Sequence, residues 1–169
     1  MKKLIIATGN KGKYNEFVNI IQNFADEIIF APDITKMIVE ETGKTYAENA
    51  MLKARAWSEK SGLPCLADDS GLEVEALDGA PGLYSARFMP GSYDDKISWL
   101  LSQLENVSNR NARFVAALAL CVPNEFTLIC EGECKGKIAL SPSGKNGFGD
   151  DPVFIPDGFD LTFAELSSD

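Results

Sequence analysis

Two adjacent carboxylates follow a short apolar segment. Residues 63–67 are mostly apolar and lead into Asp68 and Asp69, which Ser70 and Gly71 follow. The apolar residues predict a buried strand, and buried carboxylates cost free energy unless a metal ion or a cation pairs with them. Successive strand side chains point to opposite faces, so only one of the two carboxylates would face a given ligand. A tight turn, with Asp and Ser bonded to the local backbone, explains the same residues equally well.

A turn rich in glycine and lysine is the second candidate for chemistry. It follows an apolar segment at residues 3–7 and precedes apolar residues at helical spacing. Strand, turn and helix together place backbone N–H groups at a helix N-terminus, where anions bind, and the lysines add positive charge. The spacing differs from that of the P-loop, and the pattern favours a phosphate site over a plain connection. The turn consists of Thr8, Gly9, Asn10, Lys11, Gly12 and Lys13.

Glu40 and Glu41 form a second acidic pair. Glutamates in isolation are most often solvated surface charges. Mg²⁺ takes one or two carboxylates, several waters and phosphate oxygens of its ligand. A magnesium site beside Asp69 would therefore draw its second carboxylate from Glu40 or Glu41.

Composition limits the classes of function. The 169 residues suggest one domain, and the net charge of −9 argues against nonspecific binding of nucleic acid. The chain has no histidine, which excludes Ser-His and Cys-His nucleophile pairs within these residues and disfavours zinc. No apolar run is long enough to cross a membrane, and the N-terminal apolar stretch is too short for a signal peptide. Four cysteines without a C-x-x-C pair predict reduced thiols in a cytoplasmic protein.

The elements that must position these residues alternate between strand and helix before a long hairpin. Thr45 predicts a helix N-cap with Glu48 three residues later, and Gly62 predicts the end of that helix. The order indicates an α/β fold with a mixed sheet, in which loops at strand ends hold the ligand. Expected strands cover residues 3–7, 27–31, 63–67, 72–76, 113–122, 126–130 and 134–138, and expected helices follow residue 13, follow Thr45, cover residues 94–104 and begin at Thr162.

Six motifs in this order closely resemble those of the inosine triphosphatase family, the pyrophosphatases that hydrolyse non-standard purine nucleoside triphosphates. The resemblance covers essentially the whole chain. Each motif is weak alone, and the six in order are specific. They are residues 8–13, Glu40-Glu41-Thr42-Gly43 with Thr45 and Glu48-Asn49-Ala50, residues 67–72, residues 81–87, residues 148–154, and residues 162–166.

The resemblance implies an elongated mixed β-sheet with helices on both sides and two lobes around a central cleft that holds the substrate. It implies a homodimer that cleaves ITP, dITP or XTP between the α and β phosphates with Mg²⁺, without a nucleic-acid or membrane partner. Asp69 would be metal ligand and general base, and Glu41 or Glu40 the second metal ligand. Residues 8–13 would hold the triphosphate, and Ser70 would contact substrate. The base pocket would be lined by Phe148, Gly149, Asp150 and Asp151.

The sequence departs from the family pattern in two places. Asp150 replaces an aromatic residue that can stack on a purine, an interaction worth about 1–3 kcal/mol per base. The family continues past Ala164-Glu165-Leu166 to a lysine and a Ser-His-Arg segment that reads the 6-oxo purine, whereas this sequence ends at Asp169. We expect one catalytic domain over residues 1–169, shortened at its C-terminus. The alternatives are a catalytically impaired nucleotide-binding protein and a related pyrophosphatase with altered base preference.

Overall fold

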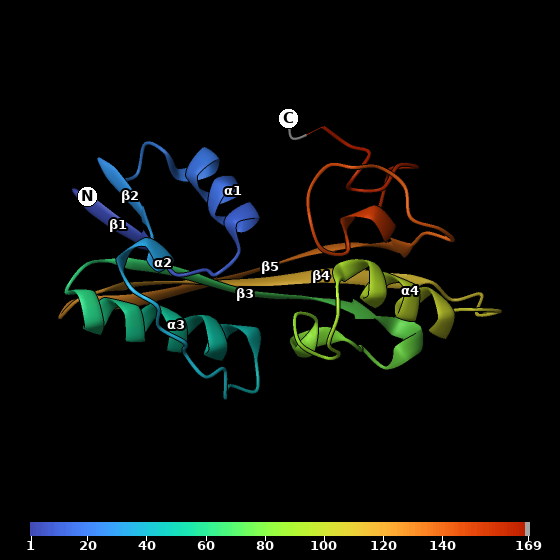
Figure 1. The fold of residues 1–169 in the computed structure, drawn as a ribbon, viewed down its shortest axis with the longest axis horizontal. Helices are drawn as coiled ribbons and strands as arrows, with labels where there is room; N and C mark the ends of the chain where they lie inside the picture. Colours follow the sequence, from blue (N-terminus) through green and yellow to red (C-terminus); the bar gives the residue numbers. More distant parts are fainter. Residues whose placement is uncertain (168–169) are drawn as a thin grey trace. The chain divides into compact units, whose positions relative to one another are not determined.

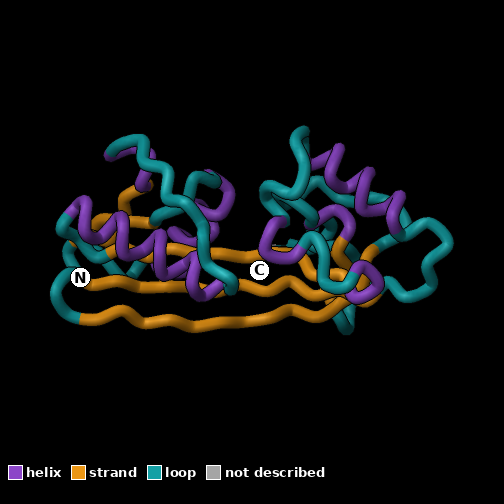
Figure 2. The backbone as a smooth tube through the Cα atoms, turned by 90° about the horizontal axis from the view of Figure 1, so that it is seen from below, coloured by secondary structure: helices purple, strands orange, loops and turns teal. Residues whose placement is uncertain are grey.

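The computed structural model describes residues 1–167, and the chain divides into two compact units. The first unit comprises Met1–Asp69 and Ala116–Gly132, and the second comprises Ser70–Val115 and Glu133–Asp169. Figure 1 follows the elements along the chain, and Figure 2 separates helices from strands. In chain order they are β1 (Lys3–Ile6), α1 (Lys11–Ile21), β2 (Glu27–Phe30), α2 (Ala31–Ile34), α3 (Tyr46–Ser61), β3 (Cys65–Val74), α4 (Tyr93–Gln103), β4 (Asn111–Val122), β5 (Phe126–Ile138) and β6 (Phe154–Pro156).

The six strands are hydrogen-bonded in the order β2-β1-β3-β4-β5-β6. β1 runs parallel to β2 and to β3, whereas β5 and β6 are antiparallel. This mixed sheet with helices confirms the predicted α/β class. Three short 3-10 helices cover Glu75–Leu77, Gly82–Tyr84 and Asp151–Val153.

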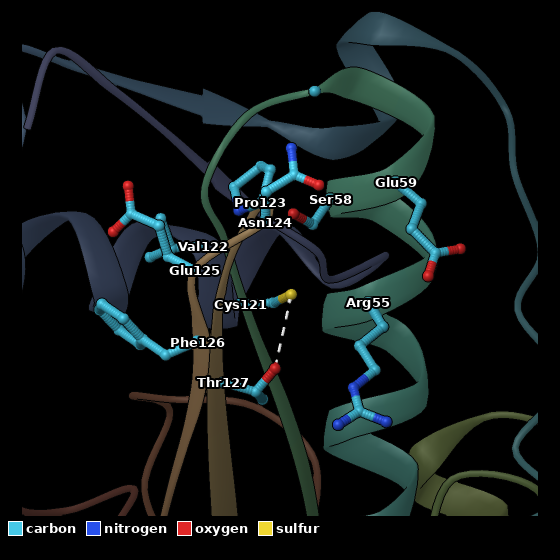
Figure 3. Close-up of a pocket in the computed structure, with 11 residues that line it drawn as sticks. Arg55, Ser58, Glu59, Cys121, Val122, Pro123, Asn124, Glu125, Phe126 and Thr127 are labelled. Carbon is cyan, nitrogen blue, oxygen red and sulfur yellow. Dashed lines mark hydrogen bonds between the residues drawn. The ribbon is translucent and has the colours of Figure 1, made fainter.

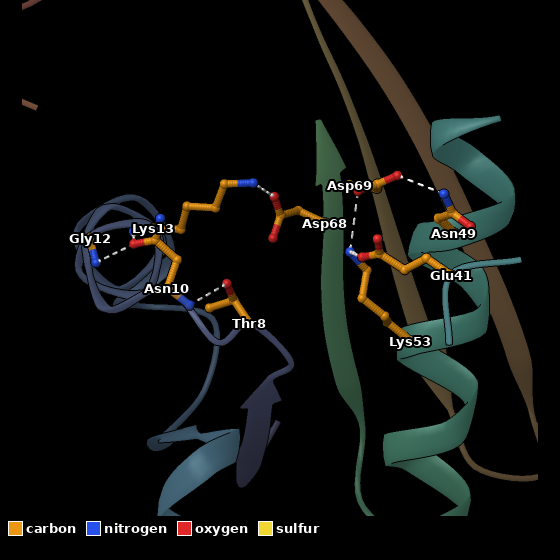
Figure 4. Close-up of polar contacts among 9 residues, drawn as sticks. All are labelled: Thr8, Asn10, Gly12, Lys13, Glu41, Asn49, Lys53, Asp68 and Asp69. Carbon is orange, nitrogen blue, oxygen red and sulfur yellow. Dashed lines mark hydrogen bonds and ion pairs between the residues drawn. The ribbon is translucent and has the colours of Figure 1, made fainter. Parts of the chain in front are cut away.

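The first unit is organised on β1, whose apolar side chains are buried on both faces. Leu4, Ile5 and Ile6 are at most 1% exposed. β1 pairs with the start of β3, where Ile5 lies opposite Cys65 and Ile6 lies opposite Leu66. Helices α1 and α3 lie on opposite sides of β3 (Figure 4), so each face of the strand meets a different helix.

Both helices that meet β3 begin at side-chain caps. The Asn10 side chain accepts hydrogen bonds from the N–H groups of Gly12 and Lys13, which starts α1. Thr45 accepts from the Glu48 N–H at the start of α3, as predicted. The Glu48 carboxylate accepts from the Lys44 N–H, one residue before the expected capping-box partner. Gly62 ends α3 with a φ of 70°, a left-handed conformation that suits glycine.

Four expected elements differ in the structure. Residues 63–67 and 72–76 were expected as two strands, but β3 is one strand over Cys65–Val74, so the acidic pair lies inside it. The two expected segments of the hairpin's second arm are likewise one strand, β5. The second strand ends at Phe30, and Pro32 lies in the short helix α2. The helix expected from Thr162 is a single turn among the described residues.

The second unit has its own apolar core. Leu72 and Val74 of β3 pack with Ile97, Leu100 and Leu104 around α4. The core extends through further buried residues of the strands and the loop before β6, namely Ala112, Ile138, Val153 and Phe154. The rings of Phe114, Phe154 and Phe163 add an aromatic cluster, with centroids 4.7–5.9 Å apart.

Two further expectations concern the chain as a whole. All four cysteines are free, as predicted, and burial raises the pKa of the Cys65 thiol to about 12. Across residues 1–167, no helix combines the length and the apolar character that crossing a membrane requires.

Candidate active site

Asp68 and Asp69 are buried and point to opposite faces of β3 (Figure 4). Their exposed fractions are 6% and 8%, so both carboxylates depend on partners from the protein. Asp68 forms an ion pair with the Lys13 ammonium of α1. Asp69 faces α3 on the other side of the strand. The alternation along one strand therefore separates the two carboxylates into two environments.

Two side chains of α3 hold Asp69. The Asn49 side-chain amide donates to Asp69 Oδ2 at 3.0 Å, and Lys53 Nζ lies 3.4 Å from Oδ1. The same Nζ lies 2.7 Å from Glu41 Oε1. One ammonium thus joins two carboxylates that are distant in the sequence. Asn49 and Lys53 are four residues apart, which places them on one face of the helix.

The environment of Asp69 makes it more basic than an ordinary aspartate. Burial has the largest effect and raises the pKa of Asp69, to which the negative charge of Glu41 adds. The Lys53 charge and the Asn49 hydrogen bond lower the pKa but do not cancel the effect of burial. A carboxylate with a raised pKa accepts a proton from water more readily, as a general base must.

The donor set suits magnesium. Asp69 Oδ1 and Glu41 Oε1 both face one cation, Lys53, and carboxylate oxygens are the ligands that Mg²⁺ prefers. Among residues 1–167, no three carboxylate, thiol or imidazole groups are arranged to hold a metal ion by themselves. Two carboxylates are sufficient where waters and substrate phosphates complete the coordination.

Glu41 and Glu40 differ in their surroundings. Glu41 is half-buried and pairs with Lys53, whereas the Glu40 side chain is exposed and forms no ion pair with any described residue. The structure therefore brings Glu41, and not Glu40, to the Asp69 group.

The segment at residues 8–13 lies on the Asp68 side (Figure 4), and its last three residues form the first turn of α1, which begins earlier than the sequence predicted. Thr8 Oγ1 accepts a hydrogen bond from the Asn10 N–H at 3.1 Å, so its side chain is engaged in shaping the turn. The Asn10 side-chain oxygen Oδ1 accepts hydrogen bonds from the Gly12 and Lys13 N–H groups, which were predicted to bind phosphate. Lys11 Nζ lies 4.3 Å and 4.4 Å from the ring centroids of Tyr14 and Phe30. A bound phosphate would therefore share the N–H groups with Asn10 or use the lysine side chains.

Ser70 and the loop at residues 148–151 belong to the second unit. Ser70 follows Asp69 directly in β3 and is half-buried. Within the loop, the Phe148 N–H donates to the Asp151 carboxylate at 2.7 Å. Gly149, with a φ of 65°, lies against Tyr93, where an added Cβ would be 3.4 Å from the ring.

Asp150 is a half-buried carboxyl group in this loop. Burial, followed by the charge of Asp151, raises the pKa of Asp150 to about 6, and the Lys96 cation opposes the shift. Lys96 is itself buried and donates to the Ala86 carbonyl at 2.6 Å. Asp150 thus lies near two charged side chains of the second unit, Asp151 and Lys96.

Sequence reasoning missed Lys53 and assigned no role to Asn49. Both lie on α3, and their four-residue spacing on one helix face was the available signal. The spacing alone could not assign a role to the two residues, because the sequence did not show which face of β3 the helix would cover. The sequence indicated that a buried carboxylate here needs a metal ion or a cation, and Lys13 is that cation for Asp68.

A separate cavity of about 640 Å³ lies between the C-terminal half of α3 and the β4–β5 turn (Figure 3). Arg55 and Ser58 line it from the helix, and Cys121, Asn124 and Thr127 from the hairpin. It includes none of the predicted site residues.

Comparison with known proteins identifies the family. The model of the Ham1 family matches residues 4–169. This chain belongs to the Ham1 family. A Ham1 protein from Coxiella burnetii has a similar structure, with a TM-score of 0.86 and 37% identity over 99% of this chain and 88% of that one. The Ham1 protein of Staphylococcus aureus gives a TM-score of 0.85 at 41% identity, over 99% and 88% of the two chains.

Curated relatives support the same family. A protein of Oceanobacillus iheyensis named dITP/XTP pyrophosphatase is 45% identical over 98% of this chain and 87% of its own length. A Haemophilus influenzae protein of the same name is 46% identical, over 99% and 89% of the two chains. The predicted resemblance to a family of pyrophosphatases for non-standard nucleotides is thereby confirmed. The predicted fold agrees with the Ham1 structures.

Proposed function

We propose that this Ham1-family chain hydrolyses non-standard purine nucleoside triphosphates, namely dITP, ITP and XTP, to the monophosphate and pyrophosphate. The Asp69–Lys53–Glu41 group is the observation that carries the proposal, because it provides a basic carboxylate beside a second carboxylate. The curated relatives named dITP/XTP pyrophosphatase support the substrate class.

The residues have distinct roles in this reaction. Asp69 accepts the proton of the attacking water, and Asn49 holds Oδ2 so that Oδ1 stays directed at the Lys53 position. Asp69 and Glu41 would hold a magnesium ion, which would supply neutralisation of the phosphate charge and activation of water. Lys13 and the first turn of α1 supply positive charge for the phosphates, while Asp68 holds Lys13 in place. Ser70 contacts the substrate.

The loop containing Phe148, Gly149, Asp150 and Asp151 lines the base pocket in this proposal. Asp150 cannot stack on a purine, so a shifted base preference is a second candidate within the same activity. We further propose that the two units act as one catalytic domain, that the protein is a homodimer, and that it works on the nucleotide pool of the cytoplasm. The free cysteines support a reducing compartment.

The test is pyrophosphate release from ITP, dITP, XTP, GTP and ATP with Mg²⁺. We expect ITP, dITP or XTP to be the best substrate and Asp69→Asn to lower the rate by about 10²–10⁴-fold, the range for a lost general base. Asp33→Asn removes an exposed carboxylate of α2 and serves as the matched control. Equal rates for wild type and Asp69→Asn would exclude the proposed base. Saturable ITP binding without turnover by wild type would instead identify a catalytically impaired nucleotide-binding protein.

A further inference from the structure

One ammonium group serves two carboxylates at the candidate metal site. Lys53 Nζ lies 2.7 Å from Glu41 Oε1 and 3.4 Å from Asp69 Oδ1. The side chains are mostly shielded from water, with exposed fractions of 17% for Lys53, 21% for Glu41 and 10% for Asp69. The Lys53 charge therefore offsets the repulsion between the Asp69 and Glu41 carboxylates, which solvent does little to screen.

Lys53 and a divalent ion compete for the same oxygens. A magnesium ion bound by Asp69 and Glu41 would approach their oxygens to about 2.0–2.1 Å, closer than the ammonium lies now. An ammonium hydrogen-bonded to the same oxygens would meet the ion at a distance where like charges repel strongly. The two cations cannot both hold these positions.

We propose that Lys53 is an exchangeable counter-ion, which neutralises Asp69 and Glu41 in the metal-free protein and leaves them when the metal binds. The inference rests on the proposed function for the identity of the metal ion. The long Lys53 side chain extends from the rigid helix α3, so the ammonium can move without a change of the backbone. Substrate phosphates are the natural acceptors for the displaced ammonium.

The exchange makes metal and nucleotide binding depend on each other. Without nucleotide, the metal must displace Lys53 from two carboxylates, so its affinity is weak. With nucleotide, the phosphates bind both the metal and the released ammonium, and the affinity rises. The coupling is reciprocal, because each ligand must raise the affinity of the other by the same factor.

A permanent structural role for Lys53 predicts the opposite result. If Lys53 only held the site in shape, its removal would leave two repelling carboxylates in altered positions, and metal affinity would fall or stay unchanged. If Lys53 is a competitor, its removal takes away the cation that competes for Asp69 Oδ1 and Glu41 Oε1, and metal affinity rises.

The experiment measures Mg²⁺ binding by calorimetry without nucleotide, for wild type and Lys53→Gln. We expect roughly tenfold tighter binding by the variant, because one charge-assisted competitor is removed. Lys60→Gln removes a positive charge from the last turn of the same helix, away from the site, and should bind Mg²⁺ like wild type. Unchanged or weaker binding by Lys53→Gln overturns the proposal.

A second measurement is needed if the Lys53→Gln variant folds poorly without metal. Urea unfolding of Lys53→Gln should show a larger gain in midpoint on addition of Mg²⁺ than wild type shows. A variant that stays unfolded at saturating Mg²⁺ overturns the proposal. These readouts do not depend on turnover: pyrophosphate release by wild type tests the proposed function, and the affinity difference tests the counter-ion role.

Discussion

At the scale of single residues, two neighbouring aspartates of β3 have different surroundings and different charge partners. Asp68 is neutralised by Lys13, a partner from α1. Asp69 shares Lys53 with Glu41 and keeps a raised pKa. The pleat separates them, since adjacent strand residues face opposite sides. The difference between the Lys13 partner of Asp68 and the Lys53 partner of Asp69 thus follows from one step along the strand.

Asp150 offers a test of how burial tunes a carboxyl group. Its pKa is raised to about 6 in the folded protein, so it retains its proton over a range in which the unfolded chain has lost it. Its contribution to stability is therefore present at low pH and lost as the pH rises through about 6. Asp150→Asn has no carboxyl group to titrate at this position, so the variant does not lose this stability as the pH rises. We expect the variant to exceed wild type in free energy of unfolding by about 1–3 kcal/mol at pH 7.5, and to resemble it at pH 4.

Urea unfolding of both proteins at the two pH values measures the difference. Asp160→Asn, which replaces an exposed carboxylate of the same unit, is the control and should show no comparable change between the two pH values. A constant difference between Asp150→Asn and wild type across this range would contradict the expected titration.

At the scale of elements, local signals predicted the helices better than the strands. Thr45 and Gly62 mark the ends of α3 because caps act through their own neighbours in sequence. The continuity of β3 was not predictable in this way. Asp, Ser and Gly at positions 68–71 are turn residues by local preference, and they remain in a strand because burial and partners from other elements favour it.

The candidate site shows the same division. Asp69 and the pair Glu40 and Glu41 could be proposed from residue type and order, since carboxylates beside a predicted phosphate site suit magnesium, but the choice of Glu41 needed the structure. Lys53 could not, because its role depends on α3 covering the Asp69 face of β3, which is a tertiary arrangement.

The packing of α3 against the β4–β5 hairpin includes an unsatisfied hydroxyl group. Ser58 is 1% exposed, and its Oγ has no hydrogen-bond partner in the described part of the chain. Figure 3 shows the side chain directed from the helix toward the hairpin turn. A buried hydroxyl without a partner costs about 1–3 kcal/mol. We therefore expect Ser58→Ala to leave the free energy of unfolding unchanged or to raise it by up to about 1 kcal/mol.

Ser61→Ala is the matched control on the same helix. Its hydroxyl donates to the Trp57 carbonyl at 2.7 Å and accepts from the Leu63 N–H at 3.1 Å, so its loss should lower the free energy of unfolding by about 1 kcal/mol. Chemical unfolding compares the two variants with wild type. If Ser58→Ala is destabilised as much as Ser61→Ala, the Ser58 hydroxyl has a partner in solution, and the adjoining cavity would be occupied.

At the scale of the whole molecule, the two compact units are joined through the strands themselves. The chain passes from one unit to the other between Asp69 and Ser70 in β3, and again within β4 and β5. Asp69, the predicted base, and Ser70, a predicted substrate contact, are thus neighbours in sequence that belong to different units. Composition gave no sign of this boundary, because it falls inside strands, where neither linker residues nor a change in polarity marks it.

Assembly into the proposed homodimer is a property of the whole molecule that can be tested in solution. We propose residues 84–88 as the subunit contact of this dimer, because Tyr84 in this segment is a large side chain that is 60% exposed. The Arg87 guanidinium carbon lies 5.5 Å from the centroid of the Tyr84 ring, and Tyr and Arg are the residue types that most often anchor interfaces. We expect light scattering to give twice the 18.4 kDa mass of one chain, and Tyr84→Glu to shift it toward a single chain. Phe159→Glu, at a 54% exposed aromatic residue of the same unit, should remain dimeric. A Tyr84→Glu dimer that persists on dilution would place the contact elsewhere, because a buried glutamate without a partner cannot be accommodated at the centre of an interface.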